Sequence, residues 1–394
     1  MPEPRQVVCV TGASAGLGRA IVQRFAREGA HVALLARGRE RLEAAAREVE
    51  AGGGRALVLP TDVADADAVE AAAETTEREL GPIDVWVNNA MVSVYSPIKE
   101  MTAAEFRRVT EVTYLGYVHG TLAALHRMLP RDRGVIVQVG SALAYRSIPL
   151  QSAYCAAKHA IVGFTASLRS ELIHDGSNVR VTMVHMPALN TPQFDWTRNR
   201  LPNRPQPVPP IFQPEVGAEA VFHAAQHDVG RELMVAWPTV KAVLGNKVIP
   251  GYLDHYLADV AYEGEQTNEP EDPDRPDNLF QPVPGDWAAH GRFDRRSKWE
   301  SWELALRLNR QLLAVAGAGL AGLAIGALTG RRHPDVERPI RADGAIGAGE
   351  GAYADALEYA RADGAATEPP ARSGAEPPDS ALAALHVPTA EPPR

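Results

Sequence analysis

Short apolar runs alternate with longer stretches of helical period through the first half of the chain. The runs are rich in Val, Ile and Leu, whereas the stretches between them carry Ala, Glu and Arg. Continuous apolar runs are typical of strands buried on both faces of a parallel sheet, with helices as the connections. The sequence therefore predicts an α/β fold with a doubly wound parallel sheet. The expected strands cover residues 7–12, 31–37, 55–63, 83–90, 134–141, 178–186 and 231–237.

The pattern changes after residue 187, where proline becomes frequent. Residues 193–214 are too rich in proline for a continuous helix, so we expect a flap there, either ordered or mobile. An acidic, Pro-rich stretch follows later in the chain, with the composition of a linker. We expect a domain over residues 1–262, a linker over 263–290, a basic amphipathic helix over 291–311 and a disordered tail over 331–394.

Charge and cysteine content narrow the classes of function. The formal net charge is -9, which opposes wholesale nucleic-acid binding because a surface that follows phosphates needs excess Lys and Arg. The two cysteines, Cys9 and Cys155, have no spacing that suggests a metal cage, so we expect no metal site. The first residues lack the pattern of a secretory signal, which favours a start in the cytoplasm.

A glycine motif lies between the first expected strand and the helix after it. Thr11, Gly12, Gly16 and Gly18 form the pattern T-G-x-x-x-G-x-G. Glycines at such a turn let the backbone approach a pyrophosphate, and the following helix offers N–H donors and the positive end of its dipole. A plain tight turn is the alternative, but the βαβ pattern that continues behind the motif favours a dinucleotide site.

The end of the second expected strand indicates which dinucleotide binds. NAD sites usually place an acidic residue there, whereas this sequence has no carboxylate before Glu40. Arg37 occupies the position from which a guanidinium pairs with a 2′-phosphate, with Ser14 and Arg39 as candidate helpers. The sequence thus favours NADP(H) over NAD(H), with a solvated arginine as the alternative reading of Arg37.

Three further residues suggest acid-base chemistry. Tyr154 and Lys158 are four residues apart, so they share one face of an expected helix. A tyrosine with a pKa near 10 acts as a general acid and base at neutral pH when a nearby cation favours the phenolate. Ser141 ends the fifth expected strand, where its hydroxyl is placed to bond a substrate carbonyl. Alone, the Tyr–Lys pair would be read as an exposed surface pair.

In combination, these motifs resemble those of the short-chain dehydrogenase/reductase superfamily over about residues 6–240. The resemblance implies a Rossmann fold and direct hydride transfer between a nicotinamide and a carbonyl or secondary alcohol carbon. It implies that Tyr154 exchanges the proton with the substrate oxygen and that Ser141 orients the substrate. It also implies that Lys158 binds the nicotinamide ribose and lowers the pKa of the tyrosine.

The motifs and the resemblance together give a set of expected cofactor contacts. Asp62 and Val63 match the pair that contacts adenine, Asn89 and Ala90 match the motif that lines the nucleotide, and Thr191 is expected at the carboxamide. The full expected set is Thr11, Gly12, Ser14, Gly16, Leu17, Gly18, Arg37, Asp62, Val63, Asn89, Ala90, Tyr154, Lys158 and Thr191.

The sequence departs from the family pattern at three places. Met91 follows N-N-A where the family has glycine, and Ala188 replaces the glycine of a Pro-Gly pair. Thr113 stands where the family usually has an asparagine that anchors a water in the proton relay. Because threonine also forms hydrogen bonds, we retain Thr113 as a candidate catalytic residue. None of the three changes removes a group that performs the chemistry.

Residues 312–330 form an uncharged stretch between arginines, long enough at 1.5 Å per residue to cross a bilayer. Five glycines would weaken a helix in water, but small residues at 318, 322 and 326 allow helices to pack closely in lipid. The sequence favours a transmembrane or membrane-embedded helix over a soluble oligomerisation helix or a disordered stretch. Six Lys or Arg residues and two tryptophans lie just upstream, which favours the cytoplasmic face.

We therefore expect a membrane-tethered, NADP-preferring oxidoreductase that acts on a small carbonyl or alcohol substrate. If the enzyme takes this substrate from the bilayer, the substrate is lipophilic. The resemblance also favours a homo-oligomer. The alternative function is a non-catalytic scaffold of the same fold that senses nucleotide at the membrane. The alternative location is the cytoplasm.

Overall fold

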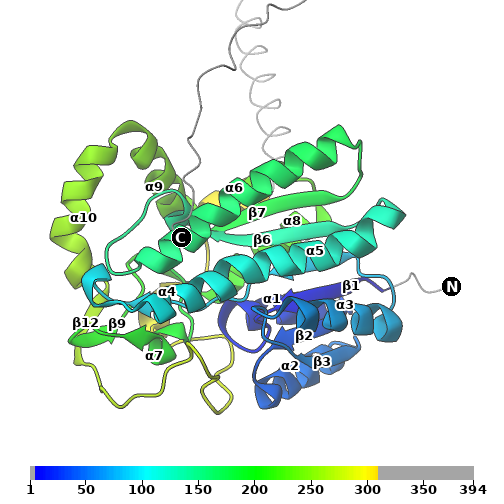
Figure 1. The fold of residues 1–394 in the computed structure, drawn as a ribbon, viewed down its shortest axis with the longest axis horizontal. Helices are drawn as coiled ribbons and strands as arrows, with labels where there is room; N and C mark the ends of the chain where they lie inside the picture. Colours follow the sequence, from blue (N-terminus) through cyan, green and yellow to red (C-terminus); the bar gives the residue numbers. More distant parts are fainter. Residues whose placement is uncertain (1–4, 309–394) are drawn as a thin grey trace, which may run out of the picture. The chain divides into compact units, whose positions relative to one another are not determined.

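The computed structural model describes residues 5–308, which are built around a seven-stranded sheet (Figure 1). The strand order is β11-β7-β6-β4-β1-β2-β3, and every neighbouring pair is parallel. This confirms the expected parallel α/β fold. The strands are β1 (Val7–Thr11), β2 (His31–Ala36), β3 (Ala56–Pro60), β4 (Val85–Asn88), β6 (Val135–Ser141), β7 (Arg180–Met186) and β11 (Glu232–Met234).

Helices cover both faces of the sheet because alternate strand residues point to opposite sides. In β1, Val8 and Val10 pack into one apolar cluster and Val7 and Cys9 into the other. The first cluster holds α1 (Gly16–Ala26), α2 (Arg39–Ala51) and α8 (Pro214–Gln226). The second holds α3 (Ala66–Leu80), α5 (Gly116–Met128) and α6 (Ser152–His174), with α4 (Ala103–Thr110) leading into α5 through the π-helical turn η2 (Glu111–Leu115).

The order of the strands fixes where a ligand binds. From β1 the chain proceeds outward to β2 and β3, and it then returns to place β4 on the other side of β1. The loops after β1 and β4 therefore diverge to opposite faces, and a crevice forms between them at the carboxyl ends of the strands.

The Pro-rich flap at 193–214 is ordered in the structure. Each of its short strands pairs with a strand from elsewhere in the chain: β8 with β5, β9 with β12 and β10 with β13. The flap elements are α7 (Gln193–Trp196), β8 (Arg198–Asn199), β9 (Asn203–Pro205) and β10 (Ile211–Phe212), and their partners are β5 (Val94–Tyr95), β12 (Gln266–Pro270) and β13 (Ser297–Lys298).

The structure differs from the expected linker over 263–290. After β11 come α9 (Ala236–Val248) and α10 (Pro250–Gly264), and the chain then turns back, so residues 263–308 belong to the same compact unit as the sheet. Leu279 is fully buried in the second apolar cluster. The segment is acidic and rich in proline, but backbone hydrogen bonds and a few apolar anchors fasten it to the domain, which composition alone does not reveal.

The expected basic helix over 291–311 is also different in the structure. Only α11 (Trp302–Leu308) is α-helical in the described part of this range. Phe293 instead packs in an apolar cluster with the flap, and the Asp294 carboxylate accepts a hydrogen bond from Asn190 at 2.8 Å. These contacts favour an irregular path along the domain over a free helix.

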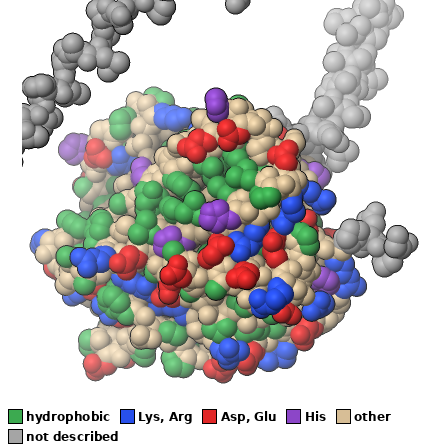
Figure 2. Space-filling view, turned by 45° about the vertical axis from the view of Figure 1, so that its right-hand side comes forward, with side chains coloured by type: hydrophobic (Ala, Val, Ile, Leu, Met, Phe, Trp, Pro, Cys, Tyr) green, Lys and Arg blue, Asp and Glu red, His purple; other side chains and the backbone are tan. Residues whose placement is uncertain are grey.

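The surface carries several exposed apolar side chains. Figure 2 shows one face, on which hydrophobic side chains gather above a band of charged ones. Leu122 on α5 and Ile173 on α6 are among the exposed large side chains. Between residues 5 and 308, no helix is both long and apolar enough to cross a membrane. The expected membrane helix at 312–330 and the tail at 331–394 lie outside the described residues.

Candidate functional site

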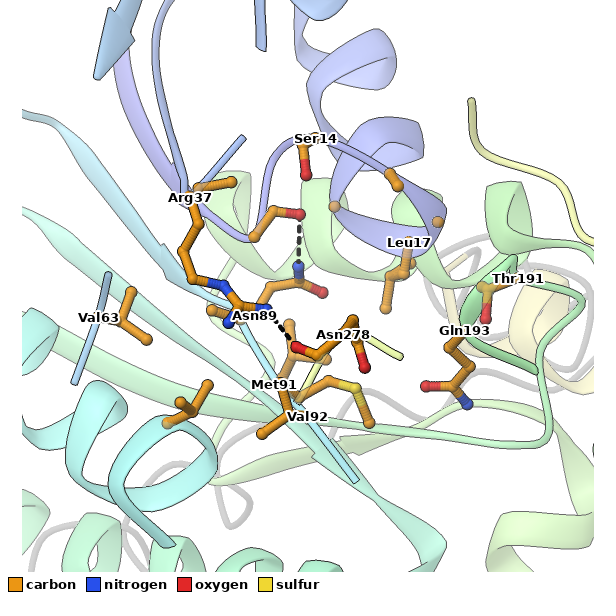
Figure 3. Close-up of a pocket in the computed structure, with 18 of the residues that line it drawn as sticks. Ser14, Leu17, Arg37, Val63, Asn89, Met91, Val92, Thr191, Gln193 and Asn278 are labelled. Atoms are coloured by element: carbon orange, nitrogen blue, oxygen red, sulfur yellow. Dashed lines mark hydrogen bonds between the residues drawn. The ribbon is translucent and has the colours of Figure 1, made fainter. Parts of the chain in front are cut away.

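A pocket at the carboxyl ends of the strands brings most of the expected site residues together (Figure 3). Those that line it are Gly12, Ser14, Gly16, Leu17, Gly18, Arg37, Asp62, Val63, Asn89, Ala90, Ser141, Tyr154, Lys158 and Thr191. Within the described part of the chain, Thr11 and Thr113 are the two expected residues that do not line it. Gly12 and Thr191, 179 positions apart, thus meet at one crevice.

The glycine loop after β1 is closed tightly on itself. Gly12 and Gly16 have φ values of +67° and +57°, a region that side chains other than glycine rarely adopt. A Cβ on Gly18 would lie 2.1 Å from Gly12 O, so only glycine fits there. Thr11 fastens the loop from behind, because its hydroxyl accepts from the backbone N–H groups of Asn89 and Ala90 at 2.9 and 3.1 Å.

The residues fit a dinucleotide phosphate. Ser14, Gly16, Leu17 and Gly18 all line the pocket at the start of α1. The N-terminus of an eleven-residue helix therefore faces this space, with its N–H donors and the positive end of the dipole. The bare glycine backbone leaves room for an anionic group at this point.

Arg37 lies at the end of β2 and faces the pocket, as Figure 3 shows. Its Nη2 donates to Asn278 O at 2.5 Å and its Nη1 donates to Leu279 O at 3.4 Å. Burial, with Arg108 nearby, lowers the pKa of Arg37, although a guanidinium stays charged at any physiological pH. Asp62 forms an ion pair with Arg108, with 2.5 Å between Asp62 Oδ2 and Arg108 Nη2, and this pair fixes the loop after β3.

Lys158 is fully buried at the floor of the pocket. Its Nζ donates to Val139 O at 2.7 Å and to the Tyr117 hydroxyl at 2.9 Å. Tyr117 in turn donates to the same Val139 carbonyl at 3.0 Å. Burial lowers the pKa of Lys158 to about 7. These bonds hold the ammonium group in one place, 5.6 Å from the centre of the Tyr154 ring.

Tyr154 and Ser141 face each other across the pocket floor. Burial raises the pKa of Tyr154, and a hydrogen bond with Ser141 partly opposes this shift. At neutral pH the Tyr154 phenol is therefore protonated. Ser141 is the last residue of β6, and its carbonyl is 3.2 Å from Nδ1 of the buried His185. The imidazole of His185 lies 3.5 Å from the Glu232 carboxylate, which supports the strand end from behind.

Thr113 serves the neighbouring loop in this structure. Its hydroxyl donates to Val92 O at 2.8 Å and accepts from Val92 N at 3.1 Å. Thr113 thus ties the π-helical turn η2 to the segment after β4. The hydroxyl that contacts Lys158 belongs to Tyr117, which the sequence analysis did not select. A relay role for Thr113 stays a prediction.

Several pocket residues were not expected from the sequence, namely Arg41, Met91, Gln193, Trp196, Asn278 and Pro282. Arg41 had a signal, because it lies in the same short arginine-rich run as Arg37, at the start of α2. Asn278 and Pro282 had none, because they lie in the segment that has the composition of a linker.

Comparison with known proteins agrees with this geometry. Residues 6–200 match the family model for short chain dehydrogenases. An uncharacterized oxidoreductase of Bacillus subtilis, YxnA, is 30% identical over 277 residues, which cover 70% of this chain and 78% of the relative. The chain belongs to the short-chain dehydrogenase family. A second relative, the fatty acyl-CoA reductase of Acinetobacter baylyi, is 30% identical over 56% of this chain and 72% of its own length.

Solved structures give the same assignment. An alcohol dehydrogenase from Thermococcus sibiricus, complexed with 5-hydroxy-NADP, superposes with a TM-score of 0.51 at 29% identity, over 59% of this chain and 96% of its own. A short-chain dehydrogenase from Streptomyces avermitilis superposes with a TM-score of 0.55 at 27% identity, over 66% and 96%. The expected membership of the short-chain dehydrogenase superfamily is confirmed.

Proposed function

We propose that this short-chain dehydrogenase interconverts a carbonyl and a secondary alcohol with NADP(H), with Tyr154 as the general acid and base. The observation that carries the proposal is the meeting of Ser141, Tyr154 and Lys158 in the pocket that also holds the glycine loop and Arg37. A tyrosine, a buried lysine and a strand-end hydroxyl in one pocket suit proton transfer to a polarised carbonyl. The reaction belongs to the class that acts on CH–OH groups with NAD(P) as acceptor.

Bound NADPH supplies the hydride that reduces the carbonyl carbon. Ser141 donates a hydrogen bond that orients the carbonyl oxygen, and Tyr154 gives this oxygen its phenol proton. Burial keeps the phenol protonated at neutral pH, which suits the reductive direction. Lys158 lies close enough to favour the phenolate that this step leaves behind.

Arg37 supports the preference for NADP(H) over NAD(H). Its guanidinium faces the pocket at the end of β2, where a ribose 2′-phosphate is held in this architecture. A planar guanidinium pairs with a phosphate through two parallel hydrogen bonds. The Thermococcus sibiricus alcohol dehydrogenase, a structural neighbour, is itself a complex with an NADP derivative.

The substrate side of the pocket supports a lipophilic substrate. The pocket lining includes the apolar side chains Met91, Val92, Met186 and Leu189. Such a lining favours apolar ligands through burial of their surface. The Acinetobacter baylyi relative carries the name fatty acyl-CoA reductase, which is consistent with a substrate that has an aliphatic part.

Tether and assembly complete the proposal. The uncharged stretch at 312–330 would hold the enzyme at the cytoplasmic face of a membrane, with an untethered cytoplasmic protein as the alternative. Trp299 and Trp302, 59% and 68% exposed, lie just before this stretch, and tryptophan is frequent at membrane interfaces. For the homo-oligomer, the exposed Leu115, Leu122 and Leu129 recur every seven residues along α5 and its ends, which suits packing between copies.

Substitution of the tyrosine tests the reaction. We expect Tyr154→Phe to reduce turnover of aldehydes and ketones with NADPH at least about 100-fold, because the proton donor is lost. Binding of NADPH, measured by its fluorescence, should change little. Steady-state assays over a panel of straight-chain and aromatic carbonyl compounds provide the measurement, with NADH in parallel.

Tyr256→Phe is the matched control, because this tyrosine is 48% exposed on α10 and lies outside the pocket. Turnover that survives in Tyr154→Phe at the wild-type rate would refute the assigned mechanism. Tight NADPH binding without turnover of any carbonyl compound would favour the non-catalytic scaffold instead.

A further inference from the structure

Residues 278–291, which we call the strap, run along the nucleotide pocket outside the part of the chain that matches the family model. Both ends are fastened near the flap: Asn278 N donates to Trp196 O at 2.9 Å, and Gly291 N donates to Asn190 O at 3.2 Å. The strap is therefore a closed loop whose two ends are held by backbone hydrogen bonds.

Apolar anchors fix the strap to the domain. Leu279 is fully buried in the second apolar cluster, and Val283 and Ala289 are also buried. The carbonyl of Leu279 accepts a hydrogen bond from Arg108 Nε at 3.1 Å. Burial of these apolar groups stabilises one defined position of the strap.

The strap contacts the groups that would bind a dinucleotide. Two of its carbonyl groups accept hydrogen bonds from Arg37. A third, that of Gly285, accepts a hydrogen bond of 2.6 Å from Arg41 Nε. The carbonyl oxygen of Ala288, also in the strap, accepts a hydrogen bond of 2.9 Å from the backbone N–H of Gly16, the first residue of α1. The strap thus passes the 2′-phosphate end of the expected cofactor site and reaches the start of the phosphate-binding helix.

Two buried polar atoms, Oδ1 of Asn278 in the strap and Nη2 of Arg41 beside it, lack a hydrogen-bond partner among residues 5–308. Both residues line the pocket, and Arg41 is only 6% exposed. Buried polar groups are almost always paired in folded proteins, so unpaired ones at a pocket wall point to a ligand. A phosphorylated ribose supplies acceptor oxygens for the guanidinium, and the nucleoside supplies a donor for the amide oxygen.

We propose that the strap is a wall of the cofactor site, with Arg41 and Asn278 as binding residues for the phosphorylated adenosine end. The strap covers this end, so it must move for the cofactor to enter or leave. This inference rests on the proposed binding of NADP(H). It assigns a binding role to a segment in which the sequence shows no nucleotide motif.

A reversible cross-link tests the required movement. A Cβ on Gly38 would lie 3.7 Å from Cβ of Pro282, close to the separation of about 3.8 Å found in disulfides. The double variant Gly38→Cys with Pro282→Cys is saturated with NADPH and oxidised with oxidised glutathione. The native Cys9 and Cys155 are buried, so the new pair should react selectively. Mass spectrometry verifies the bond, and stopped-flow fluorescence measures NADPH release into excess NADP⁺.

We expect the oxidised double variant to release NADPH at least tenfold more slowly than the same protein after reduction with dithiothreitol. Equal release rates in the two forms would overturn the strap inference and leave the proposed function intact. Failure of the wild-type protein to bind NADPH at all would instead overturn the proposed cofactor, and the strap inference with it.

A second measurement keeps the inference open to refutation if the cross-link impairs folding. We expect Arg41→Ala to raise the Kd for NADPH about tenfold and the Kd for NADH less than twofold, because the 2′-phosphate is its partner. Arg39→Ala is the matched control, since Arg39 lies on the same helix but is 65% exposed and does not line the pocket. Equal effects of the two substitutions on NADPH binding would contradict the role of Arg41.

Discussion

Burial moves the pKa values of two ionisable side chains, Lys158 and Glu265, in opposite directions. Lys158 belongs to the candidate site, whereas Glu265 lies at the end of α10 and is completely buried. Its Oε1 accepts from Gln151 at 3.1 Å, and its Oε2 has no partner in the described part of the chain. Burial raises the pKa of Glu265 to about 8. At neutral pH this residue therefore binds a proton that the unfolded chain would release.

The sign of the effect of Glu265 on stability follows from this difference. Between about pH 4.5 and 8 the folded state binds one more proton at Glu265 than the unfolded state, so stability falls as pH rises. The side chain of Glu265→Gln cannot ionise. We therefore expect the free energy of unfolding of this variant to rise relative to the wild type across this window, by about 2–4 kcal/mol at pH 8. Urea denaturation of both proteins at pH 5, 6.5 and 8 provides the measurement. A difference that is constant with pH would contradict the raised pKa.

At the scale of elements, the approach of α5 to the sheet depends on one glycine. A Cβ on Gly120 would lie 2.2 Å from Oδ1 of Asn88 and 2.6 Å from Nε1 of Trp86, both on β4. These two atoms are themselves joined by a hydrogen bond of 2.8 Å. The Asn88 amide also donates to Gln138 on β6 at 3.0 Å, so the buried network links two central strands with the helix.

We expect Gly120→Ala to destabilise the fold by about 1–3 kcal/mol, because the added methyl group displaces a hydrogen-bonded pair in a packed core. Gly163→Ala on α6 is the control, since no atom lies within 4 Å of its added Cβ. That change should be neutral or stabilising by up to about 1 kcal/mol through helix propensity. Free energies of unfolding from urea titrations compare the two. Equal effects would show that the contact at Gly120 is unimportant.

At the scale of the whole molecule, the compact unit continues past the end of the family match. The family model ends at residue 200, but the flap, the strap and α11 all pack on the same unit. A deletion that begins inside the strap would therefore remove part of the pocket wall as well as the C-terminal region. A deletion designed to test the tether alone must begin after Leu308.

We expect the full chain to sediment with membranes and to resist extraction by alkaline carbonate. A chain that ends at Leu308 should remain in the supernatant and bind NADPH with unchanged affinity, because the uncharged stretch is absent and the pocket is complete. Fractionation with immunoblotting, followed by NADPH titration of the purified short form, measures both properties. Recovery of the full chain in the supernatant would refute the tether.

The sequence by itself determined the parallel sheet and most of the candidate site. Apolar runs, the glycine motif and the Tyr154–Lys158 spacing are local patterns, and local patterns fix strands, helices and the loops at strand ends. The parallel order then places Gly12, Arg37 and Ser141 at one edge without further information. In the structure these residues line one pocket, and their roles there stay predictions.

Only the tertiary structure decided the position of residues 263–290 and the surroundings of Lys158. An acidic, Pro-rich segment has the same composition as a free linker or as a wall of a pocket. The difference lies in contacts such as that between Arg37 and Asn278, which are 241 residues apart. The hydroxyl beside Lys158 likewise comes from Tyr117 through the packing of α5 against the sheet. Such long-range contacts leave no periodic signal along the chain, because they depend on where the completed sheet brings distant segments together.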